Sequence, residues 1–405
     1  MSLFDARKIS KLLSFGVLTS LVSFVSSLWL ASLYPVGDFG LYANLMASAN
    51  LMSGFLFLRA DMMVVNPLAG KVNMVGYAAH LLVLSTISAL VVGFVLDCFL
   101  TRSAVWTVVW AFAFALMSLS TYMLISQNRQ STLGAYRVVS VVLLNLPQLI
   151  LGLLRVPNGL IVGGVVGTTL SSILIFLNAR RGARLGVPFQ EMRHIFFAFL
   201  RPSALVTAYW ILESAYLLFY PILIARCYGI EFAGYYSFAD RLIKAPVAVL
   251  SGTLIPFIIG GISGGTLSAR EIYTELLRFW KWMAAFSLVF VFASHVLLGN
   301  LVRAVWGEKW VVATKILPFV AVYYSSYLMF TTTAFLYQHY QSMRICIRFQ
   351  ILQAVAGICA IMFIRNPFWG IPTGLLAMAL VNACSGLFQQ RLTRSKMAGS
   401  CIAHS

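Results

Sequence analysis

Long apolar runs dominate the chain, and its charged residues fall mostly in the short intervals between them. A helix needs about 20 apolar residues to cross roughly 30 Å of hydrocarbon, whereas barrel strands give shorter, alternating segments. The pattern therefore predicts an all-α integral membrane protein with twelve transmembrane helices. The predicted spans are Leu12–Tyr34, Phe39–Leu58, Val72–Leu96, Ser103–Asn128, Val138–Leu154, Val156–Ala179, Ser203–Ala225, Gly234–Phe257, Trp282–Val302, Ile316–Met343, Phe349–Ile364 and Asn366–Gln390.

Composition agrees with this pattern. Apolar residues make up 60% of the 405 residues and charged residues only 10%, which excludes an ordinary soluble domain and a disordered chain. The net charge of +18 would suggest nucleic acid in a soluble protein. Here nineteen of the 29 basic residues lie in loops on the side of the N-terminus, against seven on the other side. The positive-inside rule then places both termini in the cytoplasm and leaves no role for nucleic acid.

The spans divide into two sets of six. The longest cytoplasmic connection, 180–200, separates a predicted N-terminal bundle, 1–179, from a predicted C-terminal bundle, 201–405. Each half has a similar short outer turn after its first span, Gly37–Tyr42 in one and Ile230–Tyr236 in the other. Six spans per half predict parallel repeats related by a pseudo-two-fold axis along the membrane normal, with a substrate cavity between the halves.

Motifs for cofactor chemistry are missing from the sequence. The six cysteines and five histidines form no cluster with metal-ligand spacing, and the glycine-rich stretch Gly260–Gly265 lacks the Lys-Ser/Thr of a P-loop. We therefore expect no metal, no cofactor and no ATP site. Two other patterns in the sequence predict structural features rather than a chemical site. Close helix packing is expected at Gly159, Gly163 and Gly167, and an outer aromatic belt at Trp106, Trp306, Trp310 and Trp369.

Six ionisable residues fall within or at the edges of the predicted spans. A charge at the bilayer centre costs about 2.5–3.5 kcal/mol on insertion scales, so each needs a partner, water or a function. The cations predicted to bind substrate are Arg59, Arg241 and Lys244; the acids predicted to balance them or couple an ion are Asp61, Glu213 and Asp240.

The eighth span carries the clearest of these groups. Arg241 and Lys244 share a helical face with the small residues Ser237, Ala248 and Ser251, as expected for a cavity that receives an anion. Asp240 and Lys244 have the i, i+4 spacing of a local ion pair. The alternative is a structural ion-pair network that orients spans seven and eight.

The other three groups are placed as follows. Glu213 is expected near the midplane of the seventh span. Arg59 either lines the cavity or snorkels to the cytoplasmic headgroups, and Asp61 is expected to face interfacial water.

Three segments resemble a known family: Asp38–Val65, Ala233–Ile258 and Val305–Ala321. They are similar to the second, eighth and tenth spans of oligosaccharide flippases of the O-antigen and capsule type. These belong to the multidrug/oligosaccharidyl-lipid/polysaccharide exporter superfamily. The resemblance implies two six-helix bundles around a cationic cavity. It also implies an undecaprenyl-pyrophosphate-linked oligosaccharide as cargo, moved to the outer leaflet of a bacterial cytoplasmic (inner) membrane. A polysaccharide polymerase and glycosyltransferases would then be functional partners.

Two other functions are compatible with a polytopic membrane protein. A drug/cation antiporter of the same superfamily would need a net acidic cavity, whereas three cations and three acids are found here at membrane depth. A membrane enzyme of polysaccharide synthesis would need a sizeable extramembrane loop with an acid pair, and the predicted outer loops are only a few residues long. The sequence favours the flippase, with the antiporter second.

Overall fold

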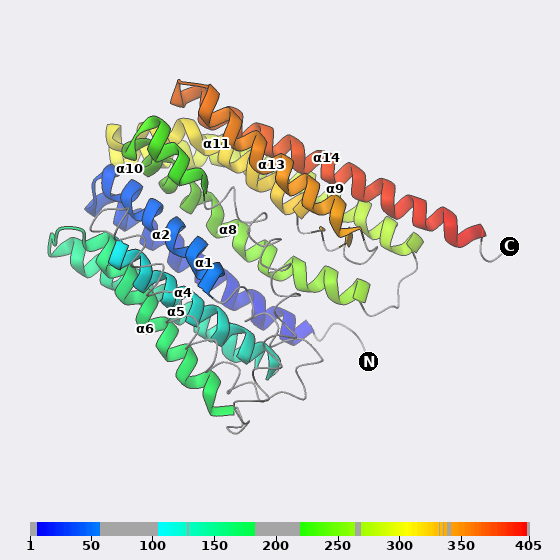
Figure 1. Cartoon of the computed structure of the whole chain (residues 1–405), viewed down its shortest axis with the longest axis horizontal. Helices are drawn as coiled ribbons and strands as arrows, with labels where there is room; N and C mark the ends of the chain where they lie inside the picture. The colour runs from blue at the N-terminus through cyan, green and yellow to red at the C-terminus, as the bar shows by residue number, and fades with distance from the viewer. Residues whose placement is uncertain are drawn as a thin grey trace. The chain divides into compact units, whose positions relative to one another are not determined.

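The computed structural model describes residues 6–56, 104–127, 129–182, 219–263, 269–331, 333–334, 336–337 and 342–402. It divides into two compact units (Figure 1). One unit, here called the N-terminal unit, comprises Leu28–Ile222; the other, the C-terminal unit, comprises Leu223–Ser405 with Met1–Ser27. The predicted spans Val72–Leu96 and most of Ser203–Ala225 lie outside the described residues.

Helices account for nearly all of the described part of the chain. The N-terminal unit contains α2, α4, α5 and α6, and α1 crosses the division between the units. The bounds are α1 Ala6–Leu33, α2 Val36–Leu56, α4 Ala104–Ser126, α5 Gln130–Leu153 and α6 Gly159–Ala179, followed by a 3-10 turn at Arg180–Gly182.

The C-terminal unit begins with a helical segment at 223–228, the end of a helix described from 219. Its α-helices are α8 Ile230–Ser263, α9 Ala269–Ala293, α10 Gly299–Trp306, α11 Val311–Ser326, α13 Met343–Phe363 and α14 Pro367–Ile402. Three irregular turns continue these helices: π-helical turns at Ser294–Leu298 and Tyr327–Thr331 and a 3-10 turn at Gly307–Trp310.

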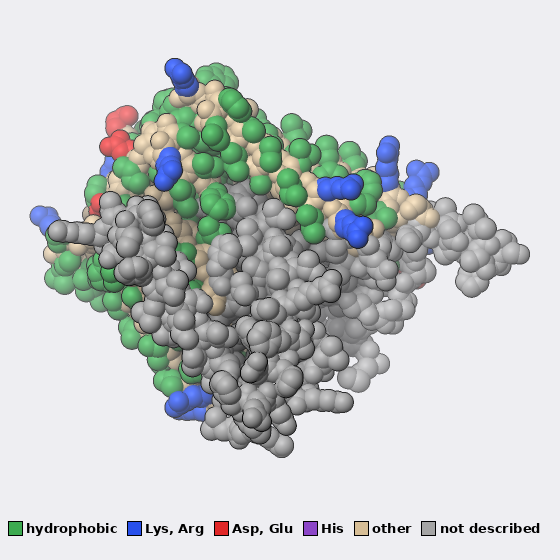
Figure 2. Space-filling view, viewed as in Figure 1, with side chains coloured by type: hydrophobic (Ala, Val, Ile, Leu, Met, Phe, Trp, Pro, Cys, Tyr) green, Lys and Arg blue, Asp and Glu red, His purple; other side chains and the backbone are tan. Residues whose placement is uncertain are grey.

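The helices have the length and surface of membrane spans. Seven helical stretches among the described residues are long and apolar enough to cross a bilayer. Their outward faces are apolar as well: Phe363 is 81% exposed and Leu288 76% exposed. Figure 2 shows hydrophobic side chains spread over the described surface, with only a few Lys and Arg side chains among them. The protein is a multi-pass integral membrane protein.

Several helices extend beyond the charge-free runs that predicted them. Helix α5 begins at Gln130 rather than Val138, and α14 continues to Ile402 rather than ending at Gln390. The predicted span Ile316–Met343 was wrong at both ends, because α11 begins at Val311 and its π-helical continuation ends at Thr331. A helix keeps its backbone hydrogen bonds where it leaves the hydrocarbon, so basic residues end the apolar run without ending the helix.

The two predicted outer turns are also helical. Most of Gly37–Tyr42 and Ile230–Tyr236 lies in the opening turns of α2 and α8, which begin at Val36 and Ile230. Their acids, Asp38 and Glu231, occupy the first turn, where a negative charge complements the helix dipole.

The two units share one pattern of helix contacts. In the N-terminal unit, α2 packs on α4, α4 packs on α6, and α5 packs on α6. These helices are the second, fourth, fifth and sixth predicted spans. In the C-terminal unit the corresponding pairs are α8 with α11, α11 with α14, and α13 with α14. The spans that correspond in sequence order therefore meet the same neighbours.

A tryptophan anchors the second helix in each unit. Trp110 on α4 is fully buried, lies 5.2 Å from the ring of Tyr42, and donates to Thr168 Oγ1 at 3.1 Å. Trp310, at the start of α11, is fully buried with its ring 4.3 Å from that of Phe238 on α8. Trp310 was predicted in an outer aromatic belt; that prediction is wrong, because the residue is part of the core.

A tyrosine closes one end of each unit in the same way. Tyr34, after α1, donates to the carbonyl oxygen of Gln148 on α5 at 2.7 Å. Tyr228 bonds to the carbonyl oxygens of Ile361 and Ile364, at the end of α13, at 2.9 and 2.6 Å. Burial, with a smaller effect of Cys227, raises the pKa of the Tyr228 hydroxyl. It therefore stays protonated, as a donor must, to satisfy carbonyls that a helix end leaves without partners.

Glycines allow α5 and α6 to touch, as their four-residue spacing predicts. A Cβ on Gly163 would lie 2.6 Å from the backbone nitrogen of Gln148, and one on Gly167 would overlap the carbonyl oxygen of Leu143. Pro147 has no N–H to bond that carbonyl within α5, so Gly167 approaches a freed acceptor. The Ser171 hydroxyl bonds to that of Ser140 at 2.6 Å along the same seam.

Substituting these glycines should destabilise the N-terminal unit. We expect Gly163→Ala or Gly167→Ala to cost about 1–3 kcal/mol, because the added methyl meets backbone that cannot move without separating α5 from α6. Thermal unfolding of the purified protein in detergent measures the loss. Gly37→Ala is the matched control, since nothing lies within 4 Å of its Cβ position. Equal melting temperatures for Gly167→Ala and Gly37→Ala would contradict the packing argument.

Candidate functional site

Three of the six predicted site residues lie on α8 and are described: Asp240, Arg241 and Lys244. The other three, Arg59, Asp61 and Glu213, lie outside the described residues, and their placement stays a prediction. Asp240 follows the start of α8 by ten residues, or about 15 Å at 1.5 Å per residue. That distance is close to half of a bilayer core about 30 Å thick.

Aromatic residues fix the first half of α8 in the C-terminal unit. Besides its contact with Trp310, the ring of Phe238 lies 5.8 Å from that of Trp306. The ring of Phe232 lies 5.6 Å from that of Phe368, at the start of α14. One turn further on, Leu242 and Ile243 are buried. One face of α8 is therefore held by packing, which sets the direction of the polar face.

The polar face of α8 changes from buried to exposed along its length. Ser237 is buried, Asp240 and Arg241 are half-buried, and Lys244 is exposed. Arg241 and Lys244 are three residues apart, so they project from neighbouring turns of the same face. This face offers two cations with side chains long enough to reach one anionic group.

Asp240 is held by a residue that the sequence did not single out. The Tyr324 hydroxyl on α11 donates to Asp240 Oδ1 at 2.8 Å, and Tyr324 is only 3% exposed. In the described part of the chain no ion pair joins Asp240 to Lys244, so their i, i+4 spacing does not produce the expected local pair. Nothing in the spacing of Tyr324 indicated this contact; only the packing of α11 on α8 brings the two groups together.

Further buried polar groups extend from Tyr324 through α11, α13 and α14. Gln353 donates to the Tyr323 hydroxyl at 3.5 Å, and Asn382 donates to Ser326 Oγ at 3.2 Å. Seven residues further along each segment, the Thr333 hydroxyl donates to Gln389 Oε1 at 2.6 Å. Bonds of this kind join helices in a bilayer, where water does not compete for the polar groups.

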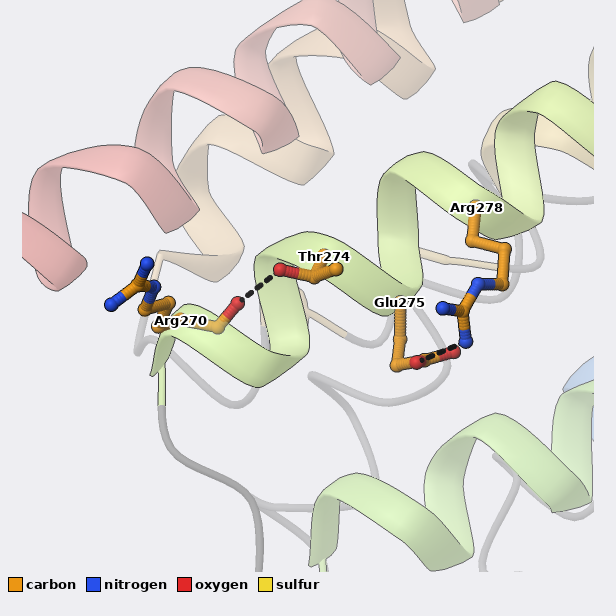
Figure 3. Close-up of polar contacts among 4 residues, drawn as sticks. All are labelled: Arg270, Thr274, Glu275 and Arg278. Carbon is orange, nitrogen blue, oxygen red and sulfur yellow. Dashed lines mark hydrogen bonds and ion pairs between the residues drawn. The ribbon is translucent and has the colours of Figure 1, made fainter.

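An exposed ion pair on α9 contrasts with the partly buried charged residues of α8 (Figure 3). Arg278 donates to Glu275 at 2.7 Å, and the two side chains are 63% and 56% exposed. At the start of the same helix, the Thr274 hydroxyl donates to the Arg270 carbonyl oxygen. Exposed ion pairs of this type contribute little to stability. Among the described residues, no group of three potential metal ligands occurs. The α9 charges are therefore a suitable control for those of α8.

Comparison with solved structures identifies the class of fold. The chain matches an inward-facing multidrug resistance MATE family transporter of the MOP superfamily, with TM-score 0.62, 13% identity, and 96% and 98% of the two chains covered. It matches the lipid II flippase MurJ in an inward closed conformation, with TM-score 0.66, 11% identity, and 95% and 91% covered. An outward-facing MATE transporter of the MOP superfamily gives 0.57 at 15% identity, covering 96% and 95%. These structural neighbours are transporters, and the chain has their fold.

The sequence itself identifies the family. The family model described as polysaccharide biosynthesis protein matches residues 72–315, which is more than half of the chain. The chain belongs to this family. The matched region includes all of α8 and the start of α11. No curated protein matches the sequence.

The contact between Tyr324 and Asp240 can be measured by a double-mutant cycle. We expect Tyr324→Phe and Asp240→Asn to be coupled by about 0.6 kcal/mol, the average for hydrogen bonds between membrane helices, and by at most about 1.7 kcal/mol. Thermal unfolding in detergent gives the four stabilities. Tyr323→Phe in place of Tyr324→Phe is the control, because its hydroxyl accepts from Gln353 instead. Zero coupling for Tyr324, or equal coupling for Tyr323, would show that the bond does not hold Asp240.

Proposed function

We propose that the protein is a flippase that moves an undecaprenyl-pyrophosphate-linked oligosaccharide from the cytoplasmic to the outer leaflet. The observation that carries the proposal is the basic face of α8 within a chain of the polysaccharide biosynthesis family. A transporter that serves polysaccharide synthesis has an anionic lipid-linked sugar as its natural cargo. The likeness to a structure named as a lipid II flippase supports the same class of substrate.

In this proposal Arg241 and Lys244 bind the pyrophosphate. Cationic side chains in a poorly hydrated site replace the water that a diphosphate loses, and charge-assisted hydrogen bonds are the strongest available for this purpose. Tyr324 holds Asp240 beside them, which limits the direct neutralisation of Lys244 by its i−4 neighbour. Arg59 is the third proposed cation, with Asp61 and Glu213 as further balancing acids.

The proposed mechanism is alternating access by two six-helix repeats, 1–179 and 201–405, joined by the connection 180–200. The shared contact pattern supports the repeats: α2–α4, α4–α6 and α5–α6 correspond to α8–α11, α11–α14 and α13–α14. The equivalent tyrosines Tyr34 and Tyr228 support them as well. Parallel repeats of this kind transport by rigid-body rocking. We further propose that the protein acts in a bacterial cytoplasmic membrane with both termini inside, together with a polymerase and glycosyltransferases.

Neutralising the two cations should stop export without preventing membrane insertion. We expect Arg241→Ala with Lys244→Ala to lower surface polysaccharide by about tenfold or more, because two charge-assisted bonds of about 1.5–3 kcal/mol each are lost. Lipid-linked glycan should accumulate on the cytoplasmic leaflet, which is measured by extraction and mass spectrometry. Arg270→Ala with Arg278→Ala removes the same charge from α9 and should leave export unchanged.

Several outcomes would overturn this proposal. Wild-type surface polysaccharide in the Arg241→Ala, Lys244→Ala variant would contradict the site. A deletion strain without accumulated lipid-linked glycan, but with lost efflux of cationic drugs, would instead support an antiporter. That alternative keeps the fold, since multidrug transporters are among the structural neighbours.

The acids allow a separate test of ion coupling. If Asp240 or Glu213 carries the coupling proton, Asp240→Asn or Glu213→Gln should reduce transport severalfold and make the remaining activity insensitive to collapse of the proton gradient. Transport into inverted vesicles with and without an uncoupler measures this dependence. Residual activity in both variants that stays as sensitive to the uncoupler as the wild type would exclude both acids as the proton carriers.

A further inference from the structure

The carboxylate of Asp240 has two groups within reach that compete for it. The Tyr324 hydroxyl on α11 donates to Asp240 Oδ1 at 2.8 Å. Lys244 lies one turn further along α8, and an acid four residues before a lysine is the favourable order for an ion pair on a helix. In the described part of the chain the carboxylate is bonded to the tyrosine, and no salt bridge joins it to the lysine. The structure therefore shows one of two arrangements that the sequence of α8 and α11 allows.

The two competing groups differ in their access to water. Tyr324 is 3% exposed, whereas Asp240 is half-buried and Lys244 is exposed. A buried hydroxyl has no water with which to replace a lost acceptor, but an exposed ammonium is hydrated on its open sides. The acid is therefore held by the buried partner, and the charge of Lys244 stays available to an anion.

Tyr324 lies in a short stretch of α11 between two irregularities. Pro318 comes six residues before it, and the π-helical turn Tyr327–Thr331 begins three residues after it. Prolines and π-helical turns both interrupt the regular ladder of hydrogen bonds, and they are the places where helices bend. The neighbouring side chains hold this stretch only weakly: Gln353 reaches the Tyr323 hydroxyl at 3.5 Å, and the buried Oγ of Ser325 has no partner. The stretch that holds Asp240 is therefore suited to a change of direction.

We propose that Asp240 is a carboxylate switch, controlled by Tyr324, that sets the affinity of the head-group site. Bonded to Tyr324, the acid leaves Lys244 available to the diphosphate of the cargo. Released by Tyr324, the acid pairs with Lys244 and displaces the diphosphate. The inference rests on the proposed function, because it takes Lys244 as a ligand of the diphosphate. Tyr324 is then a positioning residue, which acts on the cargo only through Asp240.

A switch of this kind answers a requirement of transport. A site that loads an anion from one leaflet must bind it less tightly when it faces the other, so its affinity must differ between the two states. An acid on the same helix as Lys244 can replace the charge of the cargo as the cargo leaves. The ammonium then always has a counter-charge at membrane depth, where an unpaired charge is costly. Helix α11 can control the exchange because it packs on α8 as well as on α14.

Acetylation of Lys244 tests the switch without any cargo. The full-length protein in nanodiscs is treated with acetic anhydride, and peptide mass spectrometry gives the rate at Lys244 relative to the exposed Lys281 on α9. In Tyr324→Phe the released acid should pair with Lys244 and slow its acetylation about threefold, because a paired ammonium keeps its proton and does not react. Adding Asp240→Asn to Tyr324→Phe should restore the wild-type rate, and Tyr323→Phe alone should leave it unchanged.

Binding of farnesyl diphosphate, a diphosphate on a short isoprenoid chain, tests the consequence for cargo. We expect Tyr324→Phe to raise the Kd about threefold, in proportion to the pairing of Lys244. Asp240→Asn, alone or combined with Tyr324→Phe, should bind at least as tightly as the wild type. Farnesol carries no charge, so its binding should not differ among the variants.

A second acid variant leaves Tyr324 intact and avoids the loss of a buried hydroxyl. The longer side chain of Asp240→Glu reaches Lys244 more easily, and it should slow acetylation and weaken diphosphate binding in the same direction as Tyr324→Phe. Thermal unfolding shows whether each variant is folded. Wild-type acetylation in both Tyr324→Phe and Asp240→Glu would overturn the switch.

Rescue separates the switch from a structural role of Tyr324. If Tyr324→Phe with Asp240→Asn stays as slow to acetylate and as weak in binding as Tyr324→Phe, the tyrosine supports packing and the switch is wrong. That result would leave the export defect of Arg241→Ala with Lys244→Ala, and hence the proposed function, untouched. The opposite case is also distinct. The expected acetylation pattern in a protein that does not bind farnesyl diphosphate in any variant would support the exchange of Asp240 and count against the proposed head-group site.

Discussion

The structure depends on the fact that hydrocarbon neither hydrogen-bonds to the backbone nor drives apolar helices together. The helices therefore need close contact and internal polar bonds. Gly163 and Gly167 supply the close contact between α5 and α6, where larger residues would meet backbone. Tyr34 and Tyr228 supply bonds to carbonyls on α5 and at the end of α13. Much of the described core follows from these two needs, while many large apolar side chains, such as Leu288 and Phe363, lie exposed on the surface.

The same constraint explains why the two units resemble each other in contacts more than in sequence. Trp110 and Trp310 occupy corresponding fourth spans and each packs against the second helix of its half, although their partners, Tyr42 and Phe238, differ. Packing preserves the volume and the direction of a contact and tolerates a change of residue. That tolerance also fits the comparisons, in which 11–15% identity accompanies nearly complete coverage of a transporter fold.

Polar groups in the C-terminal unit gather where α11 meets α8, α13 and α14. Asp240 is connected to α11 by Tyr324, and the neighbouring Tyr323 is connected to α13 by Gln353. Helix α11, with its proline and its π-helical end, thus takes part in the proposed head-group site through Tyr324.

Hydropathy alone determined that the chain is an all-helical membrane protein, because apolar length is set by bilayer thickness. It also determined which residues were unusual: a charge within a span is visible without a fold, so Asp240, Arg241 and Lys244 were found. Tertiary structure decided what they contact. The spacing of Asp240 and Lys244 indicated a local pair, but the hydroxyl of Tyr324, 84 positions away, bonds to Asp240. Tertiary structure also placed Trp310 in the core rather than in the outer aromatic belt. A span's length is a property of the segment itself, whereas a side chain's partner depends on which helices pack together.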